Sequence, residues 1–299
     1  MVDDFLHDPV LAATCIFQEV LNMKPPGPFP PIQELRIFGL WTRKFMIDSS
    51  GFGTGKTMGQ AIVTALRLIL MTDRHVGIIS DTFAQGKLFW TDYFDPWMRK
   101  CPLFANEIAK NNKGEHRLRH DADNYSILAR NGSEAKTLPP NFMNDSKRMK
   151  SESWTDFVGD EWTSWKNLGP ALNIIQGRVR RPLHPSYDEN DPIFSHHTAF
   201  LGAADFTWRE SYNMILLYQE RIAMGAKNYE LQAWNYLDYT KKWRQIRYGI
   251  DEENIENMMR RMTRDEIERV VLAHWMNDST GFYSAREIGD CRTPECMVA

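Results

Sequence analysis

A glycine-rich stretch over residues 45–57 has the composition of a phosphate-binding loop. It joins an apolar run to a Lys-Thr pair, and its three glycines can adopt backbone angles that let consecutive N–H groups turn towards anionic oxygens: Gly51, Gly53 and Gly55. In the pattern Gly-x-x-x-x-Gly-Lys-[Ser/Thr], Lys56 reaches the β- and γ-phosphates of a nucleotide and Thr57 holds Mg²⁺. The predicted nucleotide-binding set here is Ser50, Gly51, Phe52, Gly53, Thr54, Gly55, Lys56 and Thr57.

The loop departs from the full pattern at one position, because Ser50 stands where the first glycine belongs. A glycine turn that only makes a tight connection between a strand and a helix is the alternative interpretation. The flanking elements favour phosphate binding. A strand is predicted over 44–48, and a helix from 58 to about 71 would present its positive N-terminal end to the same phosphates.

An acidic pair supplies the second half of a hydrolytic site. Kinases and binding proteins share the phosphate loop, so hydrolysis needs an acidic partner at the end of a later strand, and Asp160 and Glu161 follow a strand predicted over 154–158. Asp160 is placed to hold Mg²⁺, directly or through water, and Glu161 to polarise a water for attack on the γ-phosphate. The alternative is a strand-end cap or a solvated pair, and Asp156 and Gly159 make this strand less uniformly apolar than most.

Gln33 and several arginines complete the candidate residues. Gln33 carries an amide that can read the adenine edge with a donor and an acceptor, the alternative being a surface glutamine. Arg178, which lies between the acidic pair and the next strand, is the candidate for neutralising transition-state charge in its own subunit or in a neighbour. Its rivals are Arg148, Arg209 and Arg221, and the alternative for each is a salt-bridged or DNA-facing arginine.

Hydrophobic periodicity predicts an α/β fold, with a mainly parallel β-sheet flanked by helices on both faces. One or two helices are predicted within residues 1–23, before a proline-rich stretch over 24–31. An Asn131-Gly132 pair gives the strongest short hairpin signal. Further helices are predicted at 32–42, 83–98 and 251–275, and further strands at 75–80, 125–129, 135–138, 198–204 and 228–239.

Composition indicates a globular protein with reduced cysteines. The chain has 299 residues, of which 42% are apolar and 25% charged, and no apolar run approaches the roughly 20 residues of a membrane span. Its start is acidic rather than signal-like, so a cytoplasmic location and no membrane partner are expected. The four cysteines are scattered without a zinc-ligand pattern. The net charge is −3, but basic residues cluster at 147–150, 178–181 and 241–244. Each cluster is either a DNA contact or a solvated face.

The order of these motifs resembles the large terminase subunit of tailed bacteriophages over roughly residues 8–290. The resemblance rests on Gln33, the loop at 50–57, the segments at 78–82, 157–161 and 201–204, and the Asn-Gly-Ser hairpin at 131–133. Two features make it more specific than a generic phosphate-loop protein: the hairpin shortly before the acidic strand, and the missing first glycine. The resemblance implies a P-loop NTPase core of the RecA/ASCE type.

The same resemblance implies a motor function. It predicts an ATPase that uses ATP and Mg²⁺ to pump double-stranded DNA into a procapsid, as a homo-oligomeric ring on the portal protein, with the small terminase subunit as a further partner. The isolated chain is expected to be a monomer, located in the cytoplasm of the infected host. In this family the strand that ends at Ala204 would carry a motif that couples hydrolysis to movement. The motif is altered here to Gly202-Ala-Ala-Asp205, so Thr198 and Asp205 are the candidate coupling residues.

Three parts of the chain are predicted from this resemblance: a helical lead-in over 1–31, an ATPase domain over 32–247, and a lid and linker over 248–299. The linker would lead to a C-terminal nuclease domain absent from this chain, through truncation or a split gene. Two other functions stay open. A helicase-like translocase would need a second RecA-like lobe, for which the chain leaves no room. An inert nucleotide-binding module would result if the change at Ser50 removed catalysis.

Overall fold

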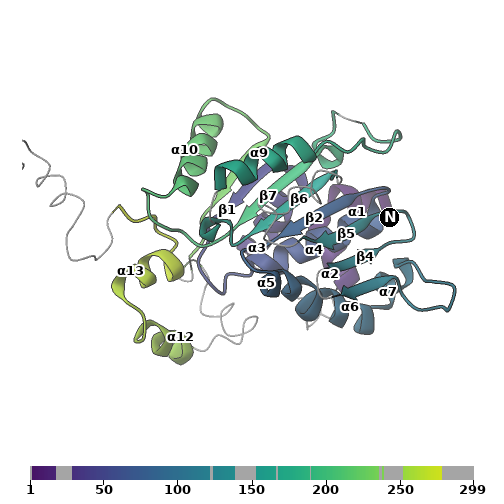
Figure 1. Cartoon of the computed structure of the whole chain (residues 1–299), viewed down its shortest axis with the longest axis horizontal. Coiled ribbons are helices and arrows are strands. Elements are labelled where there is room, and N and C mark those ends of the chain that lie inside the picture. The colour runs from purple at the N-terminus through teal and green to yellow at the C-terminus, as the bar shows by residue number, and fades with distance from the viewer. Residues whose placement is uncertain are drawn as a thin grey trace, which may run out of the picture.

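Eight strands form one twisted sheet in the order β3-β4-β5-β2-β6-β7-β1-β8 (Figure 1). The computed structural model describes residues 2–17, 29–121, 124–138, 153–165, 168–188, 190–235, 238 and 252–277. Six neighbouring strands of this order run parallel: β5, β2, β6, β7, β1 and β8. The other two, β3 and β4, add an antiparallel edge. The strands are β1 Phe45–Asp48, β2 His75–Ile79, β3 Leu118–Asp121, β4 Asn124–Leu128, β5 Glu134–Thr137, β6 Asp156–Asp160, β7 His197–Leu201 and β8 Tyr229–Gln232.

Helices cover both faces of this sheet, as predicted (Figure 1). The principal ones are α1 Val2–His7, α2 Pro9–Phe17, α3 Pro31–Thr42, α4 Lys56–Leu70, α5 Phe83–Leu88, α6 Asp95–Lys100, α7 Pro102–Glu107, α9 Leu168–Arg178, α10 Glu210–Ala223, α12 Glu252–Met259 and α13 Arg264–Glu266. Two π-helical turns, η1 Phe89–Phe94 and η6 Ile267–Val271, and two 3₁₀ turns, η3 Trp162–Ser164 and η4 Pro192–Phe194, continue or connect them. No helix in the described part of the chain combines the length and apolar character that a membrane crossing demands.

Alternate residues of the central strands enter two different cores, which is the period-2 pattern of a sheet buried on both sides. Met46 and Val158 belong to the core shared with α2, α3 and α4. Their neighbours Ile47 and Phe157 belong to the core shared with α9 and α10. Helix α4, which follows the phosphate loop, and helix α9 therefore lie on opposite faces of the sheet.

The first two helices are part of the main core. Ala12, Ala13 and Phe17 of α2 are fully buried in it, and the Trp41 indole N–H donates to the Leu6 carbonyl at 2.8 Å. Burying this apolar surface fixes α1 and α2 against α3 and α4. The boundary between residues 31 and 32, like the other domain boundaries, stays a prediction.

Several predicted elements differ from the observed ones. The helix predicted over 83–98 is three consecutive pieces, α5, η1 and α6. The helix predicted over 251–275 is divided, because Thr263 caps a new helix with a capping box. The strand predicted over 154–158 is shifted to Asp156–Asp160, and α7, α10 and β3 were not predicted.

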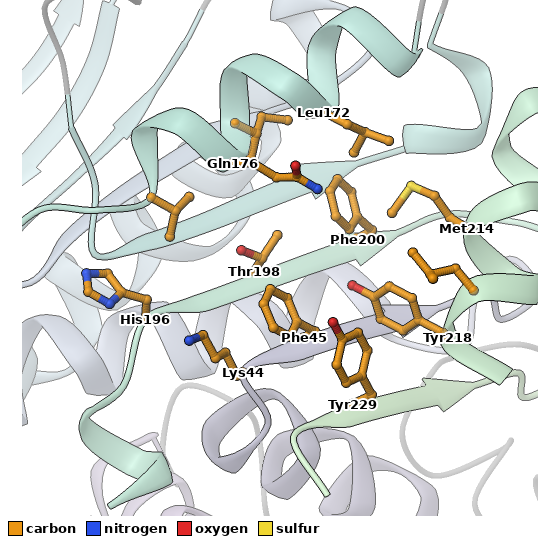
Figure 2. A pocket seen from close by; sticks show the side chains of 13 residues that line it. Lys44, Phe45, Leu172, Gln176, His196, Thr198, Phe200, Met214, Tyr218 and Tyr229 are labelled. Atoms are coloured by element: carbon orange, nitrogen blue, oxygen red, sulfur yellow. The ribbon is translucent and has the colours of Figure 1, made fainter. Parts of the chain in front are cut away.

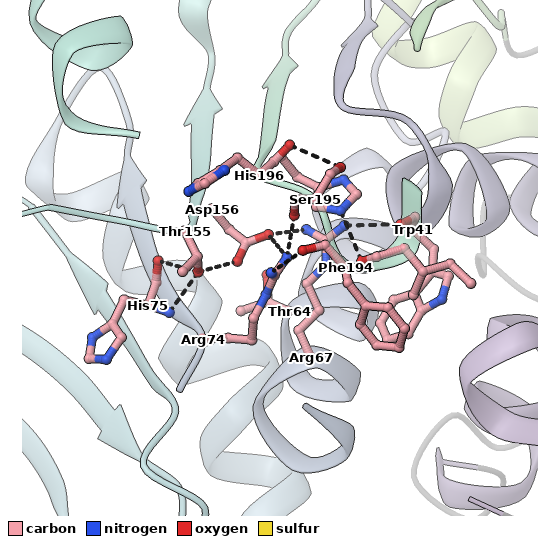
Figure 3. Close-up of polar contacts among 12 residues, drawn as sticks. Trp41, Thr64, Arg67, Arg74, His75, Thr155, Asp156, Phe194, Ser195 and His196 are labelled. Atoms are coloured by element: carbon pink, nitrogen blue, oxygen red, sulfur yellow. Dashed lines mark hydrogen bonds and ion pairs between the residues drawn. The ribbon is translucent and has the colours of Figure 1, made fainter. Parts of the chain in front are cut away.

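A buried ionic cluster explains the polar residue at the start of β6 (Figure 3). The Asp156 carboxylate forms ion pairs at 2.9 Å with both Arg67 and Arg74, and it accepts a hydrogen bond at 2.6 Å from Thr155. Burial alone would raise the pKa of Asp156, but the two guanidinium groups outweigh it and hold that pKa below its ordinary value. The cluster lies at the amino edge of the sheet.

Each arginine also reaches backbone groups of a neighbouring element. Arg67 donates to the carbonyls at the end of α3, Leu40 at 2.8 Å and Trp41 at 3.2 Å. Arg74 donates to the carbonyls of Phe194 and Ser195 before β7. The cluster thus ties α3, α4, β6 and β7 together at the ends remote from the phosphate loop.

We expect Asp156→Ala to lower the free energy of unfolding by about 3–5 kcal/mol, because it leaves two guanidinium groups buried without their carboxylate. Denaturant unfolding of the full chain measures this loss, and Asp3→Ala, which removes a carboxylate at the protein surface, should stay within about 0.5 kcal/mol of the wild type. An equal effect of the two substitutions would show that the cluster contributes little to stability.

Candidate active site

The phosphate loop occupies residues 49–55, between β1 and α4, at the carboxyl edge of the sheet. Gly53 and Gly55 have φ angles of 71° and 76°, in the left-handed region that other residues rarely adopt. The register of the strands brings the acidic pair to the same level. Leu201 of β7 pairs with Asp48 on one side and with Asp160 on the other. The loop and the acidic pair are therefore separated by one strand.

A cavity of about 350 Å³ lies between the loop and the end of β6. It gathers most of the residues that the sequence predicts, together with two that it does not, Met58 and Tyr93. The described residues that line it are Phe52, Gly53, Thr54, Gly55, Lys56, Thr57, Met58, Tyr93 and Glu161. Its position above the N-terminus of α4 suits an anion, since the free N–H groups and the helix dipole are directed there.

Lys56 lies in this cavity with its ammonium group against the loop. Its Nζ donates to the Ser50 carbonyl at 2.5 Å and to the Gly51 carbonyl at 3.0 Å. Burial lowers its pKa, and the nearby carboxylates of Asp48 and Glu161 oppose that effect. A phosphate anion beside the group would oppose it in the same way, by favouring the charged form.

Asp160 is the last residue of β6 and is buried with one carboxylate oxygen, Oδ1, that no described residue hydrogen-bonds. Burial, and next the charge of Glu161, raise its pKa to about 7, while Lys56 opposes the rise. An unpartnered buried carboxylate oxygen suits a hard cation such as Mg²⁺, which is bound through one or two protein oxygens, phosphates and water. The described residues contain no cluster of three or more His, Cys, Asp or Glu side chains. The donor set therefore fits a magnesium–nucleotide complex better than a metal held by protein alone.

Glu161 is half-buried and lines the cavity beside the loop. Its φ of 50° is unusual for a residue other than glycine, and such backbone persists only where surrounding structure imposes it. Burial raises its pKa, Lys56 opposes this, and Asp81 reinforces it. A carboxylate with a raised pKa is a better proton acceptor than an ordinary one, as a general base requires.

Gln33 lies beneath the loop rather than in the cavity lining. It is fully buried, its Nε2 donates to the Gly55 carbonyl at 3.3 Å, and its Oε1 accepts from Arg36 at 2.7 Å. Both ends of the amide are therefore used within the protein, where they support the loop. The adenine contact predicted for Gln33 stays a prediction that this geometry does not favour.

Arg36, which the sequence did not single out, fixes the loop from the same side. Its guanidinium is fully buried and donates to Asp48 and to the Thr54 carbonyl, each at 2.5 Å, and to the Ser50 hydroxyl at 3.3 Å. The Ser50 hydroxyl in turn donates to Asp48 and accepts from the Trp234 N–H at 2.9 Å. A serine in place of the first glycine is therefore part of a buried hydrogen-bond network.

We expect Ser50→Gly, which restores the first glycine of the usual pattern, to lower the free energy of unfolding by about 1–3 kcal/mol. The substitution leaves the part-buried Trp234 N–H and a buried Asp48 oxygen without their partner, and such a loss costs that much. Denaturant unfolding tests this, with exposed Ser186→Gly as the control. A more stable Ser50→Gly protein would mean that the network does not explain the serine.

Comparison with known proteins gives the fold of the chain. No protein-family model matches the sequence, and no curated protein matches it. Among solved structures, the large terminase of a thermophilic bacteriophage in complex with ADP superposes with a TM-score of 0.56 at 13% identity, covering 84% of this chain and 54% of that one. The HK97 bacteriophage large terminase gives 0.57 at 11%, covering 85% and 52%. The fold is that of the large terminases.

This chain spans about half the length of those terminases. The enzyme of the thermophilic phage has also been solved in complex with ATP-γ-S, and that structure matches with a TM-score of 0.53 at 13% identity. The likeness confirms the expected α/β fold.

The terminase fold does not bring Arg178 to the cavity of its own chain. Arg178 ends α9, and its carbonyl accepts from the Trp154 N–H at 2.9 Å, before the start of β6. Asp160 lies at the other end of that strand, six residues beyond Trp154 and therefore roughly 20 Å from it at 3.3 Å per residue. This position does not favour a role of Arg178 in its own subunit, and its role in either subunit stays a prediction.

The structure does not place Arg209 or Arg221 in the lining of the cavity either. Arg209 lies 3.5 Å from Asp205 in an ion pair, and Arg221 is in the last turn of α10. Arg148 lies outside the described residues. Among the residues that the structure describes, none that lines the cavity is an arginine.

Of the two coupling candidates, Asp205 lies at the carboxyl edge of the terminase fold and Thr198 near the amino edge. Asp205 follows β7 and pairs with Arg269 at 3.0 Å. The neighbouring Val270 carbonyl accepts from the Phe52 N–H of the loop at 2.7 Å. The segment over 263–277 thus contacts both the loop and the end of β7.

A second cavity, of about 340 Å³, lies between α9, α10 and the sheet (Figure 2). Lys44 and His196 lie at one end and Met214 at the other, with the rings of Phe45 and Tyr229 between them. It is lined mainly by apolar side chains and contains no residue of the phosphate loop. In its described lining, the second cavity therefore lacks the glycine-rich backbone and the lysine that line the first.

Proposed function

We propose that this chain is an ATPase that drives the packaging of double-stranded DNA in the manner of a large terminase. One observation carries the proposal: Lys56, Thr57 and Glu161 meet in one cavity. The unpartnered Asp160 oxygen and the terminase fold support it. The change at Ser50 does not argue for an inert module, because the serine belongs to a network that holds the loop.

The phosphate loop and the acidic pair have distinct chemical roles in this proposal. Loop N–H groups and Lys56 hold the phosphates, and Thr57 and Asp160 supply the protein oxygens for Mg²⁺. The cation would neutralise charge that develops on the phosphates. Glu161 orients a water in line with the γ-phosphate and accepts its proton as the phosphoryl bond breaks.

The proposed partners follow from the fold and not from the site. They are double-stranded DNA, the portal protein and the small terminase subunit, with a homo-oligomeric ring on the portal and a monomer in isolation. The setting is the cytoplasm of the infected host. Residues 248–299 are proposed as a lid and linker, which the contact between Val270 and the loop supports.

Steady-state ATP hydrolysis over a series of protein concentrations, with and without double-stranded DNA, tests the proposal. A rate that rises faster than linearly with concentration indicates assembly with an arginine supplied by a neighbour. A rate proportional to concentration indicates that the ATPase acts within one subunit or in an assembly that is already complete. ATP binding without hydrolysis, even with DNA, contradicts the proposal and favours the inert module.

A further inference from the structure

The cavity beside the phosphate loop has one wall that the loop and α4 do not supply. The loop and the start of α4 form one side through residues 52–58, and the remaining described lining residues are Tyr93 and Glu161. Tyr93 is therefore the one side-chain hydrogen-bond donor in this described lining that lies outside the loop and α4. Glu161, when ionised, offers only acceptors, which phosphate oxygens cannot use.

A π-helical turn places Tyr93 at this wall. In η1 the Asp95 N–H bonds to the Trp90 carbonyl, five residues back, and such turns occur frequently at functional sites. Three aromatic residues of this turn are fully buried in the main core: Phe89, Trp90 and Phe94. Tyr93 is half-buried and lines the cavity. The backbone that carries Tyr93 is thus anchored by its neighbours.

The phenol ring is held in place while its hydroxyl is available. The ring centroid lies 5.6 Å from that of Trp97, which is 2% exposed and contacts the Phe17 ring at 4.6 Å. Within the described parts of the chain, no residue hydrogen-bonds to the Tyr93 hydroxyl. A fixed ring with an available hydroxyl loses little conformational entropy when a ligand accepts a hydrogen bond from it.

The charges around Tyr93 keep it a donor. Burial, and then the negative charges of Asp92 and Asp160, raise the pKa of Tyr93 to about 12. The hydroxyl is therefore protonated throughout the physiological pH range. It can donate to an anion and cannot act as a base there.

We propose that Tyr93 donates a hydrogen bond to the terminal phosphoryl group of a bound nucleoside triphosphate, from the wall of the cavity that faces the loop. This inference rests on the proposed function and adds a residue that recognises the triphosphate state. A nucleoside diphosphate lacks the terminal group, so the contact discriminates between substrate and product. It also orients the group that Glu161 and its water must reach.

Tyr93→Phe is the direct test, because it removes the hydroxyl and keeps the ring against Trp97. We expect the affinity of the full chain for Mg²⁺ with a non-hydrolysable ATP analogue to fall about tenfold, the size of a hydrogen bond to a charged group. The affinity for Mg·ADP should be unchanged. Isothermal titration calorimetry with both nucleotides measures the difference.

Tyr125→Phe is the matched control, because it removes the same hydroxyl from β4, away from the cavity lining. It should leave both affinities unchanged. Equal losses for triphosphate and diphosphate in Tyr93→Phe, or no loss for either, would overturn the role of Tyr93. A wild-type chain that binds neither nucleotide would instead overturn the proposed function, so the two failures are distinguishable.

Discussion

Replacing Glu161 with glutamine is expected to leave Mg·ATP binding close to that of the wild type and to lower turnover by about 10²–10⁴-fold, the usual contribution of a general base. Glutamine keeps the size of the side chain but is a far weaker proton acceptor. Glu161 lines the cavity, and burial raises its pKa. Phosphate release under saturating ATP gives kcat, and a fluorescent nucleotide titration gives the affinity.

Glu107→Gln provides the matched control, because this glutamate is exposed at the end of α7. It should hydrolyse ATP as the wild type does. Normal turnover by Glu161→Gln would show that another group accepts the proton, and Asp81, whose charge acts on Glu161, is the next acidic side chain to test. Loss of binding as well as turnover would point to a change in the strained backbone at residue 161.

The parts of the site that lie in one continuous stretch could be predicted from the sequence. The loop is such a stretch, because its function depends on the backbone of consecutive residues, and Gly53 and Gly55 have the positive φ angles that their pattern requires. The hairpin around Asn131 and Gly132 is another, since two antiparallel strands flank it. Strand and helix order followed from periodicity in the same way.

Residues whose positions depend on distant partners could not be predicted. Asp156 interrupts the apolar pattern of the strand predicted over 154–158, and only its pairing with Arg67 and Arg74 explains why a carboxylate is buried there. In the sequence, Arg36 looks like an ordinary polar residue of a helix. Only the folded chain places Asp48 and the loop in contact with it. Such contacts join separate elements and leave no periodic signal.

The cases of Arg178 and Tyr93 have a more general explanation. Arg178 was chosen from chain order, but a helix that connects two parallel strands returns to the edge where the strands begin, so its end lies away from the carboxyl edge. Tyr93 lay in an aromatic-rich helix pattern, which is typical of a core, and a single π-helical turn changes residue directions without changing composition.

Replacing Lys56 with alanine is expected to abolish measurable turnover and to weaken ATP binding. The loss in kcat should be at least about 10²–10³-fold, as when a preorganised hydrogen-bond donor to the transition state is removed. The side chain has two roles here, because its ammonium also bonds to the Ser50 and Gly51 carbonyls. Lys113→Ala, at an exposed loop, is the control and should be fully active. Denaturant unfolding separates the two roles. If Lys56→Ala is as stable as the wild type, the lost activity belongs to phosphate binding. Turnover that survives the substitution would place the reaction outside this cavity.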